Sequence, residues 1–190
     1  MLWLGYELYI IETENKFNLV MKVSSLFLAI LISTNLSAEL KSKLDRQIEE
    51  LMPKVIEWRH DIHQYPELGN REFRTSKKIE EHLVSLGIEV ETKIAYTGLV
   101  GLIKGGKPGP TIALRADMDA LPVEEKTGLP FASKVRTTYL GNDVGVMHAC
   151  GHDAHVAILM GVAEFLAKNK SKIRGNILSL IHISEPTRRY

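Results

Sequence analysis

The sequence predicts an α/β protein with a mixed sheet, because amphipathic helical segments alternate along the chain with short apolar segments. Apolar residues recur at helical spacing over residues 40–62 and again over residues 154–168, which is typical of helices that pack on one face. Between them, residues 88–94, 98–104 and 111–115 have the alternating or β-branched pattern of strands. The chain has 190 residues, 45% of them hydrophobic, which is enough for one domain with a sizeable core.

Turn and capping residues predict where these elements end. Pro53 should begin a second helical piece or bend the first. A separate helix is expected over residues 75–86, with Thr75 as its N-cap and Gly87 as its C-terminal stop.

The later part of the chain alternates between strand, loop and helix patterns. The glycines and prolines of residues 105–110 predict a hairpin that joins the strands before and after them. Residues 117–147 carry no regular pattern and are expected to be irregular, and residues 176–181 have a strand pattern.

Charge and cysteine content exclude several classes of protein. The 24 Lys and Arg residues nearly balance the 23 Asp and Glu residues, so no strong field favours nucleic acid or a membrane surface. This balance, with an ordinary apolar fraction, also argues against disorder. Cys150 is the only cysteine in the sequence, which excludes an intramolecular disulfide and therefore a disulfide-stapled fold.

The N-terminal region has the composition of a targeting segment. Lys22 is followed by the apolar run 23–32 and by small residues up to Ala38, which predicts a signal peptide over residues 21–38. Residues 1–20 are then interpreted as upstream translation or disordered sequence. We expect an exported protein, periplasmic or secreted, without stable membrane insertion if the signal is used, and a cytoplasmic one otherwise. An uncleaved anchor and a buried strand are the alternatives.

Residues 147–155 (MHACGHDAH) hold the densest metal-binding chemistry of the chain. Cysteine, histidine and aspartate are the side chains that hold transition metals. Cys150 and His152 are separated only by Gly151, which lets a short loop turn both side chains toward one ion. The alternative is that these are surface histidines at the start of a helix, with no role in metal binding or catalysis. A thiol protease with Cys150 as nucleophile is less favoured, because its base normally comes from a distant segment.

Two further segments carry polar residues. Asp117 and Asp119 directly follow the apolar strand 111–115, where active-site groups collect in α/β sheets, although aspartates that cap a loop would give the same pattern. His60 and His63 lie in the polar end of a helix, where a solvated or packed role is favoured over ligation.

Together these motifs resemble the amidohydrolase branch of the aminoacylase/carboxypeptidase metallopeptidase family. The branch includes hippurate hydrolases, N-acyl-L-amino acid amidohydrolases and auxin-conjugate hydrolases. The match extends from about residue 50 to residue 178. Its motifs are 58–69 (WRHDIHQYPELG), 115–122 (RADMDALP), 127–131 (TGLPF) and 147–153 (MHACGHD).

The resemblance implies a three-layer α/β/α metallohydrolase catalytic domain with a mixed sheet, of which residues 39–178 are the N-terminal part. It implies hydrolysis of N-acyl amino acids, which are small molecules, by water on two divalent ions of zinc or manganese type. The full-length form is expected to be a homodimer. Cys150 and His152 correspond to metal ligands, and Asp117 and Asp119 to catalytic acidic residues. Asp153 and His155 are candidates for supporting the ligands.

The resemblance ends after Leu178. There the family continues into a Gln-Pro-Ala-Glu-Glu motif that supplies a general base and a metal ligand. This chain instead reads SLIHISEPTRRY over residues 179–190, where Glu185 is a lone carboxylate in a different context. We therefore expect a fragment that is inactive alone. A non-catalytic metal-binding or interaction domain is the alternative.

Overall fold

The computed structural model describes residues 39–182, which fall into two packing units with the boundary between Gln47 and Ile48. In the first unit, residues 39–47 are helical and carry an exposed ion pair between Lys41 Nζ and Asp45 Oδ2, at 3.2 Å. The predicted signal peptide lies outside the described residues, so it stays a prediction. No helix of residues 39–182 combines the length and the apolarity needed to cross a bilayer.

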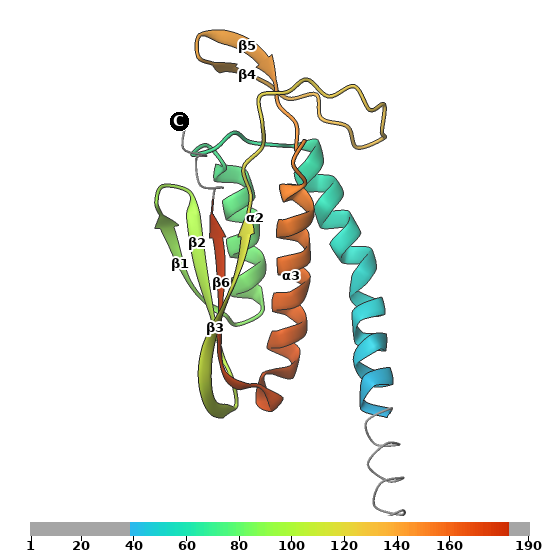
Figure 1. The fold of residues 1–190 in the computed structure, drawn as a ribbon, viewed down its shortest axis with the longest axis vertical. Coiled ribbons are helices and arrows are strands. Elements are labelled where there is room, and N and C mark those ends of the chain that lie inside the picture. The colour runs from blue at the N-terminus through green and yellow to red at the C-terminus, as the bar shows by residue number, and fades with distance from the viewer. Residues whose placement is uncertain (1–38, 183–190) are drawn as a thin grey trace, which may run out of the picture. The chain divides into compact units, whose positions relative to one another are not determined.

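The second unit begins with helical residues 48–64, here called the 48–64 helix. The remaining elements follow in the order shown in Figure 1: α2 (Phe73–Ser85), β1 (Glu89–Ile94), β2 (Gly98–Lys104), β3 (Lys107–Asp117), β4 (Arg136–Tyr139), β5 (Asn142–Gly145), α3 (His152–Asn169), a 3₁₀ turn (Lys170–Lys172) and β6 (Arg174–His182). The α/β class predicted from the sequence is confirmed.

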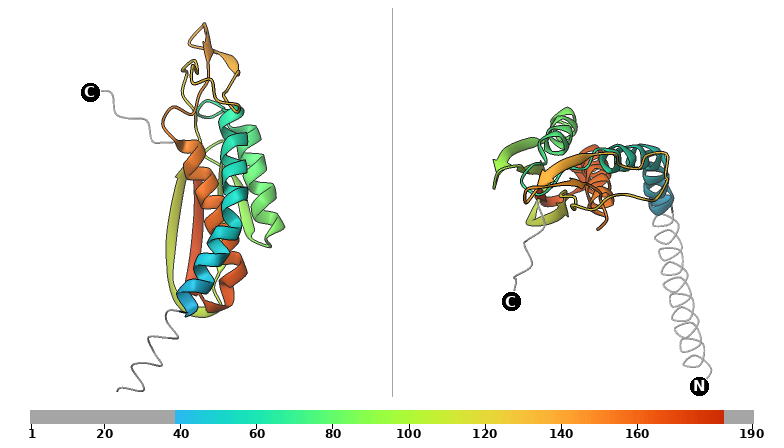
Figure 2. Two further views of the ribbon diagram at one scale, coloured as in Figure 1. Left: turned by 90° about the vertical axis from the view of Figure 1, so that its right-hand side faces the viewer. Right: turned by 90° about the horizontal axis from the view of Figure 1, so that it is seen from above.

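Four strands form one mixed sheet in the order β1-β2-β6-β3, in which only the β3–β6 pair is parallel. Figure 2 shows α2, α3 and the 48–64 helix on one face of this sheet. The described residues therefore contain the sheet and one helical layer of the expected three-layer arrangement. β4 and β5 form a separate two-stranded sheet.

The core lies between this sheet face and the helices. Along β6 the side chains alternate, so that Ile177, Ser179 and Ile181 are buried and the residues between them are half-buried. Ile62, Ile79 and Leu83 reach the same cluster from the helices, each with no exposed surface. This apolar packing is the main source of stability for the unit and fixes the end of β3 against the start of α3.

The hairpin predicted at residues 105–110 is wrong. β6 lies between β2 and β3 and pairs with both of them. Pro108 and Pro110 have no backbone N–H to donate across a hairpin. The backbone N–H groups of Gly105 and Gly106 donate instead to the carbonyl oxygens of Gly175 and Lys170, at 3.0 and 2.8 Å. The chain reverses direction at this turn, as predicted, but β2 and β3 each pair with the distant β6 and not with each other.

Three boundary predictions also have outcomes. Thr75 is not the N-cap of α2, since Glu72 occupies that position and Thr75 is buried in the first turn. Gly87 follows the end of α2 with a φ of +70°, as expected for a C-terminal stop. The 48–64 helix remains helical through Pro53.

The irregular stretch expected over residues 117–147 contains one hairpin that the sequence analysis missed. β4 and β5 are joined by Leu140 and Gly141, whose φ values of +50° and +81° suit a tight two-residue turn.

Candidate metal centre

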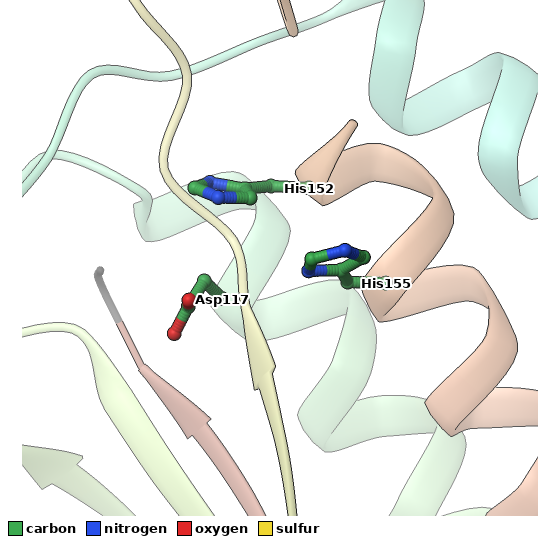
Figure 3. A group of neighbouring side chains, drawn as sticks. All are labelled: Asp117, His152 and His155. Carbon is green, nitrogen blue, oxygen red and sulfur yellow. The ribbon is translucent and has the colours of Figure 1, made fainter. Parts of the chain in front are cut away.

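The candidate centre lies where β3 ends and α3 begins. Asp117 is the last residue of β3, Asp119 follows two positions later, and His152 is the first residue of α3. Gly151 precedes α3 with a φ of +90°, a left-handed conformation that glycine adopts without strain. The motifs around residues 117 and 152, far apart in the sequence, therefore meet at one end of the sheet (Figure 3).

Three metal-binding side chains converge there. Asp117, His152 and His155 each offer one ligand atom, and these atoms all lie within 4.8 Å of one another. His152 is buried, Asp117 is half-buried and His155 is exposed, so the group opens to solvent on one side. Two imidazole nitrogens and a carboxylate oxygen are a donor set suited to zinc and related divalent ions.

Asp119 orients the central histidine of this group. The Nδ1 atom of His152 lies 2.8 Å from the backbone oxygen of Asp119 and 3.1 Å from its Oδ1 atom. Nδ1–H donating to these oxygens leaves Nε2 as the nitrogen that can meet an ion. A histidine that binds a metal usually donates its other ring N–H to such an oxygen, because that bond fixes both the tautomer and the ring plane.

The other predicted ligand, Cys150, is not a member of this three-residue group. The side chain of Cys150 is exposed, and its sulfur is not part of the three-residue donor group found among the described residues. Of the four residues predicted for the site, the fold thus brings together Asp117, Asp119 and His152. His155, expected to support the ligands, offers a donor atom itself.

His148 adds an unusual buried group beside the centre. It is 4% exposed, and neither ring nitrogen has a hydrogen-bond partner within the described residues. Burial lowers the pKa of His148 to about 4, so its ring is neutral near neutral pH and keeps one lone pair. A buried imidazole without partners is expected to pair with an ion, water or ligand, and it therefore fits a metal centre.

A buried polar network lies next to His152. His63 Nδ1 is 3.0 Å from Oδ2 of Asp153, and His63 Nε2 is 3.1 Å from Oε1 of Glu125. Arg59 Nε also donates to Asp153 Oδ2, at 3.2 Å. Burial by itself would raise the pKa of Asp153, but the hydrogen bonds from His63 and Arg59 outweigh it, and the pKa is lowered.

Sequence reasoning missed most of this network. His63 was predicted to be solvated or packed, and it is packed, with 5% exposure, but its contacts with Asp153 and Glu125 were not predicted. The available signal was the spacing of Arg59 and His63, which are four residues apart and so share one face of the helix. Nothing in the sequence indicated Glu125, because it reaches His63 from an irregular segment 62 residues away.

Comparison with known proteins identifies the motifs. Residues 113–187 match the model of peptidase family M20/M25/M40. The chain is thus similar to members of the M20 family. Thermostable carboxypeptidase 1 of Saccharolobus solfataricus is 50% identical over 148 residues, which are 77% of this chain and 36% of the carboxypeptidase. An N-acyl-L-amino acid amidohydrolase of Geobacillus stearothermophilus is 38% identical over 145 residues, 76% of this chain and 37% of the amidohydrolase.

A solved M20 structure has the same fold. The Bacillus subtilis YXEP protein, described as a dinuclear metal-binding peptidase of the M20 family, superposes with a TM-score of 0.64 at 40% identity. The superposition covers 72% of this chain and 36% of that one. The chain therefore spans about a third of the length of the M20 relatives it matches, 36% and 37% of the two curated ones.

Proposed function

We propose that the protein carrying this chain is a metal-dependent amidohydrolase that cleaves the amide bond of N-acyl amino acids or similar conjugates. The observation that carries the proposal is the buried His152, which Asp119 holds through Nδ1 beside the donor atoms of Asp117 and His155. A histidine that only packs in the core needs no metal-ligand atoms beside it, so this arrangement is suited to binding a metal ion.

The residues of the chain divide into ligands and orienting groups. We propose that the site holds two divalent ions of zinc or manganese type. Cys150 and His152 would be among their ligands. Such ions polarise a substrate carbonyl and lower the pKa of bound water. Asp119 orients His152, and the half-buried Asp117 adds a carboxylate oxygen to the group.

The M20 relatives support the substrate class and the metal. One is named an N-acyl-L-amino acid amidohydrolase, and the matched solved structure is described as dinuclear. We further propose that the whole protein is an exported homodimer and that residues 39–178 alone do not turn over substrate.

The experiment compares metal binding and hydrolysis. Zn²⁺ titration by calorimetry, and the absorption of bound Co²⁺, would be measured for Cys150→Ala, His152→Ala and the control His60→Ala, whose ring stacks on Phe131 at 3.8 Å. We expect the first two to lose more than about 100-fold in affinity, because even changes in outer-shell residues cost about 10–100-fold. The control should bind as the unmodified protein does.

Hydrolysis of N-acetyl amino acids by the intact protein completes the test. Chelation should abolish the activity, and Zn²⁺, Mn²⁺ or Co²⁺ should restore it. Activity that survives chelation, or unchanged metal binding in both ligand variants, would contradict the proposal. Metal binding without hydrolysis of any N-acyl amino acid would instead support a non-catalytic metal-binding domain.

A further inference from the structure

His63 connects two buried carboxylates that belong to different parts of the fold. The ring is on the 48–64 helix, Asp153 is the second residue of α3, and Glu125 lies in the segment between β3 and β4. The side chains of His63, Asp153 and Glu125 are 7%, 1% and 0% exposed, respectively. Three groups that can carry charge are thus enclosed together, at a considerable cost of desolvation.

The hydrogen bonds define what the ring does. Nδ1 of His63 lies 3.0 Å from a carboxylate oxygen of Asp153, and Nε2 lies 3.1 Å from one of Glu125, so the ring is a direct link between the two carboxylates. The guanidinium of Arg59 also donates to Asp153. Replacing such a group with an apolar core is often neutral or stabilising, so stability alone is a weak reason for it.

Both ends of the link lead to the candidate centre. Asp153 directly follows His152 in the first turn of α3. Glu125 belongs to the segment that starts after Asp119 and returns just before His148. Its two ends are paired by hydrogen bonds between Leu121 and Met147, each at 3.0 Å.

Glu125 also organises its own segment. Its Oε1 accepts the hydroxyl of Thr127, and its Oε2 accepts the backbone N–H of Ser133. These bonds lower the pKa of Glu125 against the opposing effect of burial, together with the bond from His63. Phe131 of the same segment packs edge-on against His63, with ring centroids 5.5 Å apart. The carboxylate thus holds residues 125–133 in one arrangement and fastens them to the 48–64 helix.

We propose that His63 is a positioning residue of the metal centre. By joining Asp153 to Glu125, it sets the first turn of α3, with His152, relative to the segment that enters at Asp119 and leaves at His148. This inference rests on the proposed metal-dependent function. His63 itself contacts neither substrate nor metal in this role. It acts through Asp153 and Glu125.

The test measures metal affinity, stability and kinetics in the intact protein. The variants are His63→Gln, Glu125→Gln and the control Glu124→Gln, which removes an exposed carboxylate one residue away. We expect both link variants to bind Zn²⁺ about 10-fold more weakly, within the range known for partners of metal ligands, and the control to bind unchanged. With saturating Zn²⁺, kcat should fall in both link variants while KM stays within about twofold, because the metal geometry and not substrate binding is disturbed.

The outcomes separate the two proposals. If the thermal midpoint of the metal-free protein falls but Zn²⁺ affinity and kcat are unchanged, the link is only structural and the positioning role is overturned. If His63→Gln does not fold, Glu125→Gln decides, since it keeps the shape of the side chain and removes only its charge. If the unmodified protein neither binds Zn²⁺ nor hydrolyses an N-acyl amino acid, the proposed function itself fails, and this inference fails with it.

Discussion

At the scale of single residues, the chemistry of each histidine depends on its partner. His152 is directed by the oxygens of Asp119, His63 lies between two carboxylates, and His148 is buried with no hydrogen-bond partner in the described part of the chain. His82 is a fourth case, half-buried in the last turn of α2, where its Nε2 lies 3.2 Å from the carbonyl oxygen of Met160. Histidine thus serves as a candidate ligand, as a link between two carboxylates and as a partly buried packing residue in one unit.

His82 should make stability depend on pH. Burial lowers its pKa below the ordinary value of 6.5. The unfolded chain therefore takes up a proton near pH 6.5 while the folded chain resists it, so acid favours unfolding. We expect the urea midpoint of the metal-free chain to fall between pH 7.5 and pH 5.5, and to fall less in His82→Gln, which keeps a donor for the carbonyl of Met160.

The comparison with the variant isolates this residue. His148 has a pKa lowered in the same direction and contributes equally to both proteins. Burial raises the pKa of Glu72, which acts in the opposite sense near its own titration range, again in both. An equal loss of stability in the two proteins over this pH range would count against the assignment.

At the scale of elements, α2 is held to the sheet by one apolar face. Leu83 has no exposed surface and joins the main core cluster, whereas its neighbour Val84 is 56% exposed. Leu83→Ala should therefore cost about 2–5 kcal/mol of unfolding free energy, from lost burial and the cavity left behind. Val84→Ala, the matched control on the same helix, should change it by less than about 0.5 kcal/mol. Urea unfolding of both variants measures the difference, and similar losses would mean that α2 does not pack as described.

At the scale of the whole unit, the sheet has one covered and one open face. Val100, Leu102, Leu178 and Leu180 are half-buried on the face away from the helices, where no described element covers them. β3 lies at the edge of the sheet and pairs only with β6 among the described strands, so its other side presents unpaired backbone groups. Such an edge is a template for pairing with another chain.

The edge predicts self-association of the 190-residue chain. Ile112 on β3 is 52% exposed, and a lysine there would oppose edge-to-edge pairing by charge. Ile112→Lys should increase the monomer fraction at high protein concentration without lowering the thermal midpoint, as measured by sedimentation velocity. An unmodified chain that stays monomeric at all concentrations would show that the edge is protected.

Local features were predicted well because their causes are local. The strand over residues 98–104, the stop at Gly87 and the helix that became α3 follow from side-chain period and turn chemistry within a few residues. The N-cap of α2 was missed because Glu72 caps it without a side-chain hydrogen bond, so the usual residue type was no guide.

By itself, the sequence determined the α/β class, the position of most elements and the motifs whose residue types suit a metal. Only the tertiary structure decided that β6 separates β2 from β3, that Asp119 orients His152, and that Glu125 meets His63. The reason is physical: strand pairing and buried hydrogen bonds join groups far apart in the chain, and each residue's local pattern is compatible with many such partners.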